Sequence, residues 1–105
     1  MPQFDVYRNP DRATQARIPY VVVLQSDLLD TLNHFVVAPL RIKQDNSVIP
    51  MLRLNPLVTI DGDELHVRVQ DIATVPRHLL RRPVTNLASQ RDDILAALDF
   101  LFNGY

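Results

Sequence analysis

Short apolar runs, separated by prolines and polar turns, dominate most of the chain. The run Tyr20–Leu24 is β-branched and almost continuously apolar, which is typical of a strand buried on both faces. Gln3–Tyr7 and Phe35–Ala38 have the composition of further short strands. We expect Pro39 to end the latter, because proline cannot donate to a sheet ladder. The polar segment Arg8–Arg17 predicts a loop.

The clearest hairpin signal is the Asp-Gly pair at 61–62, which can supply the positive φ angles of a tight turn. It separates two strand-like runs, Leu57–Ile60 and Leu65–Val69, and the second alternates strictly. The apolar side chains of the second run are predicted to face the core. His66 and Arg68 are predicted to face the other side, so we expect His66 to be solvated.

Near the C-terminus the apolar period changes to three and four residues, which predicts one amphipathic helix. Its apolar positions include Leu87, Ile94, Leu95, Leu98, Leu101 and Phe102. Ser89 with Asp92 is typical of a capping box, and Asn86 is a second candidate N-cap. Gly104 lies where a C-cap glycine is expected. The whole pattern predicts one mainly β domain over residues 1–105: an antiparallel sheet of perhaps five strands, closed as a small barrel or sandwich, with one C-terminal α-helix.

Composition agrees with a single globular domain: of 105 residues, 47% are hydrophobic and 22% charged. The formal net charge of −1 argues against a protein whose main task is to coat nucleic acid. The absence of cysteine excludes disulfides and thiolate metal sites. The N-terminus lacks a signal-peptide pattern, and no apolar stretch approaches the roughly 20 residues of a membrane span. We therefore expect a cytoplasmic protein without a membrane partner.

No motif for catalysis or cofactor binding stands out. His34, His66 and His78 have no partner at metal-ligand spacing, and two glycines cannot form a phosphate-binding loop. We therefore expect no metal, no cofactor and no catalytic residue. A basic cluster within residues 77–82 could meet phosphate, although a solvated edge is the simpler interpretation.

Phe102 and Tyr105 place two aromatic side chains within the last four residues. A chain end usually frays and tolerates change. Aromatic residues there indicate either docking onto the chain's own core or an exposed anchor for a partner. The residues alone leave both alternatives open.

Several further segments share one ordered pattern: Gln3-Phe4-x-Val6-Tyr7, Gln25–Thr31, Val36-Val37-x-Pro39-Leu40, Asp71–Pro76, Val84-x-x-Leu87, Arg91-x-Asp93-Ile94, Ala97 and Gly104. In order and spacing they resemble the CcdB toxin family over nearly the whole chain. The resemblance implies an SH3-like antiparallel barrel with a C-terminal helix, assembled as a symmetric homodimer.

The resemblance also implies a function. Toxins of this family bind the A subunit of DNA gyrase and trap the enzyme on cleaved DNA, without a covalent step of their own. The chain is thus expected to be an inhibitor and not an enzyme. A CcdA-like antitoxin would wrap the dimer and release gyrase. The toxin–antitoxin complex would repress its own operon, so operator DNA would be a partner only indirectly, through that complex.

The gyrase contact of the family maps onto the end of the helix and a second region: Phe102, Asn103, Gly104, Tyr105, Leu28 and Leu29. Phe102 and Gly104 fit the family pattern. Asn103 departs from it, because the best-known members carry tryptophan there, and Tyr105 replaces an aliphatic residue.

Two alternatives remain. A MazF/Kid-like endoribonuclease toxin would share the general barrel, and His34, Arg53, His66 and Arg68 could serve its chemistry. However, the chain lacks the glycine-rich N-terminal segment of that family. Alternatively, the chain is a CcdB homologue that no longer acts on gyrase, which the Asn103 departure would explain.

Overall fold

The computed structural model describes residues 2–29, 31–43 and 53–104. Their strands are β1 (Asp5–Arg8), β2 (Tyr20–Val23), β3 (His34–Ile42), β4 (Leu57–Ile60), β5 (Asp63–Val67), β6 (Ala73–Pro76) and β7 (Thr85–Asn86). Their helices are the α-helix α1 (Arg91–Asn103) and four 3-10 turns, η1 (Asp27–Leu29), η2 (Val69–Asp71), η3 (Arg77–Leu79) and η4 (Ala88–Gln90). Within the described residues, no helix is long and apolar enough to cross a membrane.

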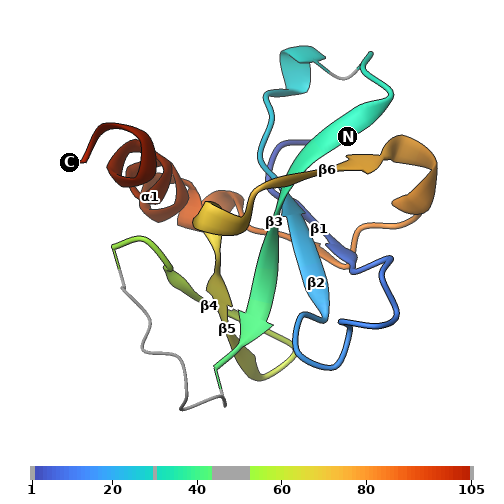
Figure 1. Cartoon of the computed structure of the whole chain (residues 1–105), viewed down its shortest axis with the longest axis horizontal. Coiled ribbons are helices and arrows are strands. Elements are labelled where there is room, and N and C mark those ends of the chain that lie inside the picture. Colours follow the sequence, from blue (N-terminus) through green and yellow to red (C-terminus); the bar gives the residue numbers. More distant parts are fainter. Residues whose placement is uncertain (1, 30, 44–52, 105) are drawn as a thin grey trace.

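The strands form one antiparallel sheet in the order β4-β5-β3-β2-β1-β7, with β6 added beside β3. The sheet curls into a nearly closed barrel, and α1 lies at its side (Figure 1). The predicted mainly β barrel with a C-terminal helix is therefore confirmed. The described residues contain more strands than the five expected, because the short pieces β6 and β7 carry no strong strand signal.

The long strand β3 is central, and its partner on one side changes along its length. Its first half pairs with β6, through His34↔Pro76 to Val37↔Ala73, and its second half pairs with β5 from Leu40↔Val67 onward. Pro39 lies at the change of partner, where its carbonyl oxygen accepts a hydrogen bond from the Arg68 N–H at 2.9 Å. The prediction that Pro39 ends the strand is wrong, because the missing N–H falls in the gap between two partners.

Apolar side chains pack on both faces of β2, as its continuous apolar run predicted. The larger cluster fills the barrel and includes Val6, Val22, Leu40, Leu65, Ile94 and Ala97. The smaller cluster lies on the opposite face and consists of Tyr7, Val21, Val23, Phe35, Val37 and Leu80. Of the two clusters, helix α1 packs in the first, through its fully buried residues Ile94 and Ala97.

The predicted hairpin is confirmed: β4 pairs with β5, and Asp61 and Gly62 have φ angles of 51° and 82°. The first predicted strand begins later than expected, at Asp5. Phe4 adopts a φ of 69°, and its N–H donates to the Val23 carbonyl at 2.8 Å while its side chain is buried. A positive φ is strained for an aromatic residue, so the barrel core must hold Phe4 in place.

The two ends of the C-terminal helical region differ from each other. The capping box predicted at Ser89 is wrong, since no side chain caps the start of α1 at Gln90. Asn86 is not an N-cap either: its Oδ1 accepts a hydrogen bond from the Ala88 N–H at 2.7 Å in a turn that leads into η4, whose N-cap residue is Leu87. At the other end, Gly104 has a φ of 80° and its N–H donates to the Phe100 carbonyl at 3.0 Å, which confirms the predicted C-cap.

Candidate partner-binding surface

The C-terminal end of α1 carries an exposed aromatic side chain. Phe102 is 70% exposed, although the periodicity places it on the apolar face of the helix. Ile94 and Ala97 occupy the core contact of α1 earlier in the helix, and Leu101 is only partly buried. Phe102 is therefore not docked onto the core of its own chain, and its ring is exposed.

The two described residues that follow Phe102 are exposed as well. Asn103 and Gly104 are exposed, and the left-handed turn at Gly104 ends the helix directly beyond the ring. Tyr105, the other aromatic residue of this end, lies outside the described residues. We call Phe102, Asn103 and Gly104 the tail surface.

A cation–π contact supports the last turns of α1. The Arg53 guanidinium carbon lies 4.4 Å from the centre of the Phe100 ring. Phe100 is partly buried, and Arg53 belongs to the segment that leads into β4. This contact ties the end of the helix to the barrel, so the tail surface is presented from a held helix.

A second exposed apolar surface lies on η1. Leu28 is 91% exposed and Leu29 is 48% exposed. The Ser26 Oγ accepts a hydrogen bond from the Leu28 N–H at 3.2 Å within the turn, whereas the Asp27 carboxylate accepts one from the Gln3 N–H and so ties the turn to the N-terminal segment. These two hydrogen bonds hold the turn in place. Leu28 and Leu29 lie on this turn with their side chains exposed to solvent.

The two apolar surfaces are separate on one chain. In Figure 1, η1 follows β2 and precedes β3 at the top of the view, whereas α1 ends at the C label on the left. A partner that contacts both surfaces must therefore span the molecule, or meet them on two copies of the chain.

The three histidines do not gather into a site. His34 and His78 are exposed, but the prediction of a solvated His66 is wrong because it is only 8% exposed. Its Nδ1 donates to the Asn55 carbonyl at 3.1 Å, since the segment before β4 folds against β5. Within the described residues, no group of three metal-ligating side chains lies together.

The residues considered for RNA cleavage are also dispersed. His34 pairs with Pro76 at the start of β3, whereas His66 pairs with Arg41, seven residues along the same strand and so roughly 20 Å away. Arg53 stacks on Phe100, and the Arg68 Nε donates to the Asp71 carboxylate at 2.6 Å. The four residues therefore do not form one catalytic centre.

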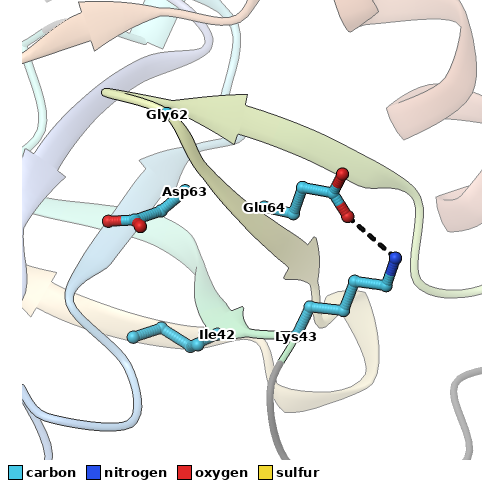
Figure 2. A pocket seen from close by; sticks show the side chains of 5 residues that line it. All are labelled: Ile42, Lys43, Gly62, Asp63 and Glu64. Atoms are coloured by element: carbon cyan, nitrogen blue, oxygen red, sulfur yellow. Dashed lines mark hydrogen bonds and ion pairs between the residues drawn. The ribbon is translucent and has the colours of Figure 1, made fainter.

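A hollow of about 310 Å³ lies beside the β4–β5 turn and is lined by Ile42, Lys43, Gly62, Asp63 and Glu64. Figure 2 shows Lys43 reaching Glu64, with an Nζ–Oε2 distance of 2.8 Å, while Asp63 points away from both. The hydrogen bond and charge of Lys43 lower the pKa of the Glu64 carboxyl group. The two carboxylates thus do not act as a pair, and the hollow has no arrangement for acid–base chemistry.

The fold and the exposed apolar surfaces define a small β-barrel protein suited to binding another macromolecule. A comparison with protein-family models identifies the family: the model described as CcdB protein matches residues 3–104. The match spans nearly the whole chain, so the chain belongs to the CcdB family, and it is a toxin of the toxin–antitoxin class.

Proposed function

We propose that this toxin binds the A subunit of DNA gyrase and traps the complex of gyrase with cleaved DNA, without catalysing a reaction itself. Binding one conformational state of an enzyme better than the others shifts the population toward that state. A binding surface alone is therefore sufficient for the proposed poisoning.

The exposed Phe102 carries this proposal. Exposed aromatic residues on a held helix are frequent hot spots of protein interfaces. The Leu28–Leu29 pair offers a second apolar contact, 91% exposed at Leu28. Asn103 adds an exposed amide where the best-known members of the family carry tryptophan, so Phe102 would supply most of the apolar anchor at this end.

The remaining partners follow from family membership. We expect a homodimer in the cytoplasm, which a CcdA-like antitoxin binds and neutralises, and which represses its operon as part of that complex. The separation of the tail surface from Leu28 and Leu29 fits such a dimer, since a second copy would place two sets of both surfaces on one particle.

The test combines a DNA cleavage assay with growth measurements. Purified toxin is added to gyrase, ATP and supercoiled plasmid, and linear DNA is counted after detergent and protease treatment. We expect linear DNA with the wild-type chain and much less with Phe102→Ala. Leu79→Ala is the matched control, because Leu79 is 45% exposed and lies outside both apolar surfaces.

Two results would contradict the proposal. Folded wild-type toxin that leaves gyrase unaffected would identify a homologue without gyrase activity. Cleavage of RNA by the purified protein, lost on replacing His66 or Arg68, would instead identify an endoribonuclease.

A further inference from the structure

Strand β4 lies at one edge of the sheet and pairs on one side only, with β5 (Figure 1). The pairing runs from Leu57↔His66 to Ile60↔Asp63. Along an antiparallel pair, residues that bond the neighbouring strand alternate with residues whose N–H and C=O groups point away from it. This alternation decides which backbone groups of β4 face outward.

One hydrogen bond at the start of β4 fixes the alternation. The Val67 N–H donates to the Pro56 carbonyl at 2.9 Å, so the backbone of Pro56 faces β5. Val58 and Ile60 follow at intervals of two residues, and their backbone groups therefore face β5 as well. The backbone groups of the residues between them face away from β5: Leu57 and Thr59.

The backbone of β5 supports the same alternation. The Lys43 N–H donates to the Glu64 carbonyl at 3.1 Å, so the backbone of Glu64 faces β3 and not β4. Glu64 is paired with Thr59, and the two members of such a pair both point away from each other. Within residues 2–29, 31–43 and 53–104, no backbone group bonds the outward N–H and C=O groups of Leu57 and Thr59.

The edge of β4 differs from the other edges of the sheet. Strand β7 has two residues and closely follows Pro83, and β6 ends with Pro76. Short strands and prolines at an edge prevent the addition of a further strand. Strand β4 contains no proline, and the side chains of Leu57 and Thr59 are both exposed to solvent.

The extended conformation of β4 is held by the barrel. Val58 and Ile60 are 2% and 3% exposed and pack in the larger apolar cluster. The tight turn at Asp61 and Gly62 joins β4 to β5. The outward groups are therefore presented by a preformed strand, which lowers the entropic cost of binding.

We propose that the free edge of β4 binds an extended segment of a partner protein, which adds to the sheet as a further strand. The outward N–H and C=O groups of Leu57 and Thr59 form its main-chain hydrogen bonds. Bonds of this kind supply the affinity in strand addition, and the side chains beside them supply the specificity. The proposal does not depend on gyrase binding.

The charges at the two ends of β4 indicate the chemistry of the added segment. Asp61 and Asp63 are exposed at the turn, and neither forms an ion pair with a cation in the part of the chain that the structure describes. Arg53 precedes the other end of β4, where its guanidinium stacks on Phe100. A segment with a basic residue near the turn and an acidic residue near Arg53 is therefore complementary in charge.

The test titrates a synthetic peptide into the isotope-labelled toxin and follows the amide signals by NMR. The peptide has eight residues, in which threonine and valine alternate between a terminal lysine and a terminal glutamate. Methyl groups on the nitrogens of one edge prevent it from pairing with itself. We expect saturable shifts that are largest for the amides of Leu57 and Thr59. The amides of Val58 and Ile60 should shift less, because they already bond β5.

Two controls separate main-chain bonding from other contacts. A peptide methylated on every nitrogen retains all side chains but has no amide donor between them, so it should not bind. In the toxin, Thr59→Pro removes an outward N–H without removing a β4–β5 bond, and should weaken binding about fivefold or more. Thr59→Val retains every backbone group and should bind as the wild type does. Circular dichroism verifies that each variant is folded.

Three results would overturn the proposal: no shift of the Leu57 and Thr59 amides at millimolar peptide, equal binding of the fully methylated peptide, or unchanged binding by folded Thr59→Pro. The peptide control applies to the wild-type toxin, so the test does not depend on the folding of the proline variant. A toxin that leaves gyrase unaffected would leave the prediction for β4 unchanged, so the two proposals fail separately.

Discussion

Replacing Phe102 by alanine should weaken gyrase binding while leaving the fold nearly intact. Phe102 is 70% exposed. Complete burial of such a side chain stabilises a fold by about 1.5–3 kcal/mol, so the remaining contact of Phe102 contributes about 0.5–1 kcal/mol. Truncation of an aromatic hot spot costs about 2 kcal/mol or more of binding free energy, which is roughly a thirtyfold increase in Kd.

Ile94→Ala, two turns earlier on α1, is the matched comparison. Ile94 is 0% exposed and packs in the barrel core, so its truncation should lower the free energy of unfolding by about 2–5 kcal/mol. Where this variant is still folded, it should bind the gyrase A subunit with the affinity of the wild type. Denaturant unfolding measures the first quantity, and calorimetric titration with the purified gyrase A subunit measures the second.

Folded Phe102→Ala that binds gyrase as tightly as the wild type in that titration would refute this role, because Phe102 is then not the anchor. A decrease of several kcal/mol in the free energy of unfolding of this variant would show that Phe102 stabilises the fold, contrary to its exposure.

Three further predictions concern contacts that hold or end the elements. Asn86→Ala should cost about 2–3 kcal/mol in denaturant unfolding, since its Nδ2 donates to the buried Asp5 carboxylate at 2.8 Å; a double-mutant cycle with Asp5→Ala should show coupling, and additivity would contradict this. Gly104→Ala should destabilise the C-terminal end of the helix by about 1 kcal/mol, measured by hydrogen exchange. A Cβ at this position would meet no neighbouring atom, so the cost comes from the φ of 80°, which alanine disfavours. Because Lys43 lowers the pKa of Glu64 below 4.5, their pairing stabilises the fold above that pH and is lost as pH falls below it; Glu64→Gln should remove this dependence from acid unfolding curves, and unchanged curves would disprove it.

Local signals predicted the elements that depend on a few neighbouring residues. The Asp61-Gly62 turn and the Gly104 C-cap were predicted because each requires a φ angle that glycine favours. The path of β3 through Pro39 could not be predicted locally, since it depends on where β6 ends and β5 begins. His66 was wrongly predicted for the same reason: alternation gives the face of a strand, but not which segment covers that face.

The candidate surfaces show a similar division. The family resemblance pointed to Phe102 and Leu28, but periodicity alone would have placed Phe102 in the core. Only the packing of α1 through Ile94 and Ala97 leaves that ring exposed.

The most direct test of the central claim is a titration of the purified gyrase A subunit with the wild-type toxin, followed by the cleavage assay with complete gyrase, ATP and supercoiled plasmid. The account predicts saturable binding together with accumulation of linear, protein-linked DNA. Folded toxin that neither binds the A subunit nor increases cleaved DNA would contradict it.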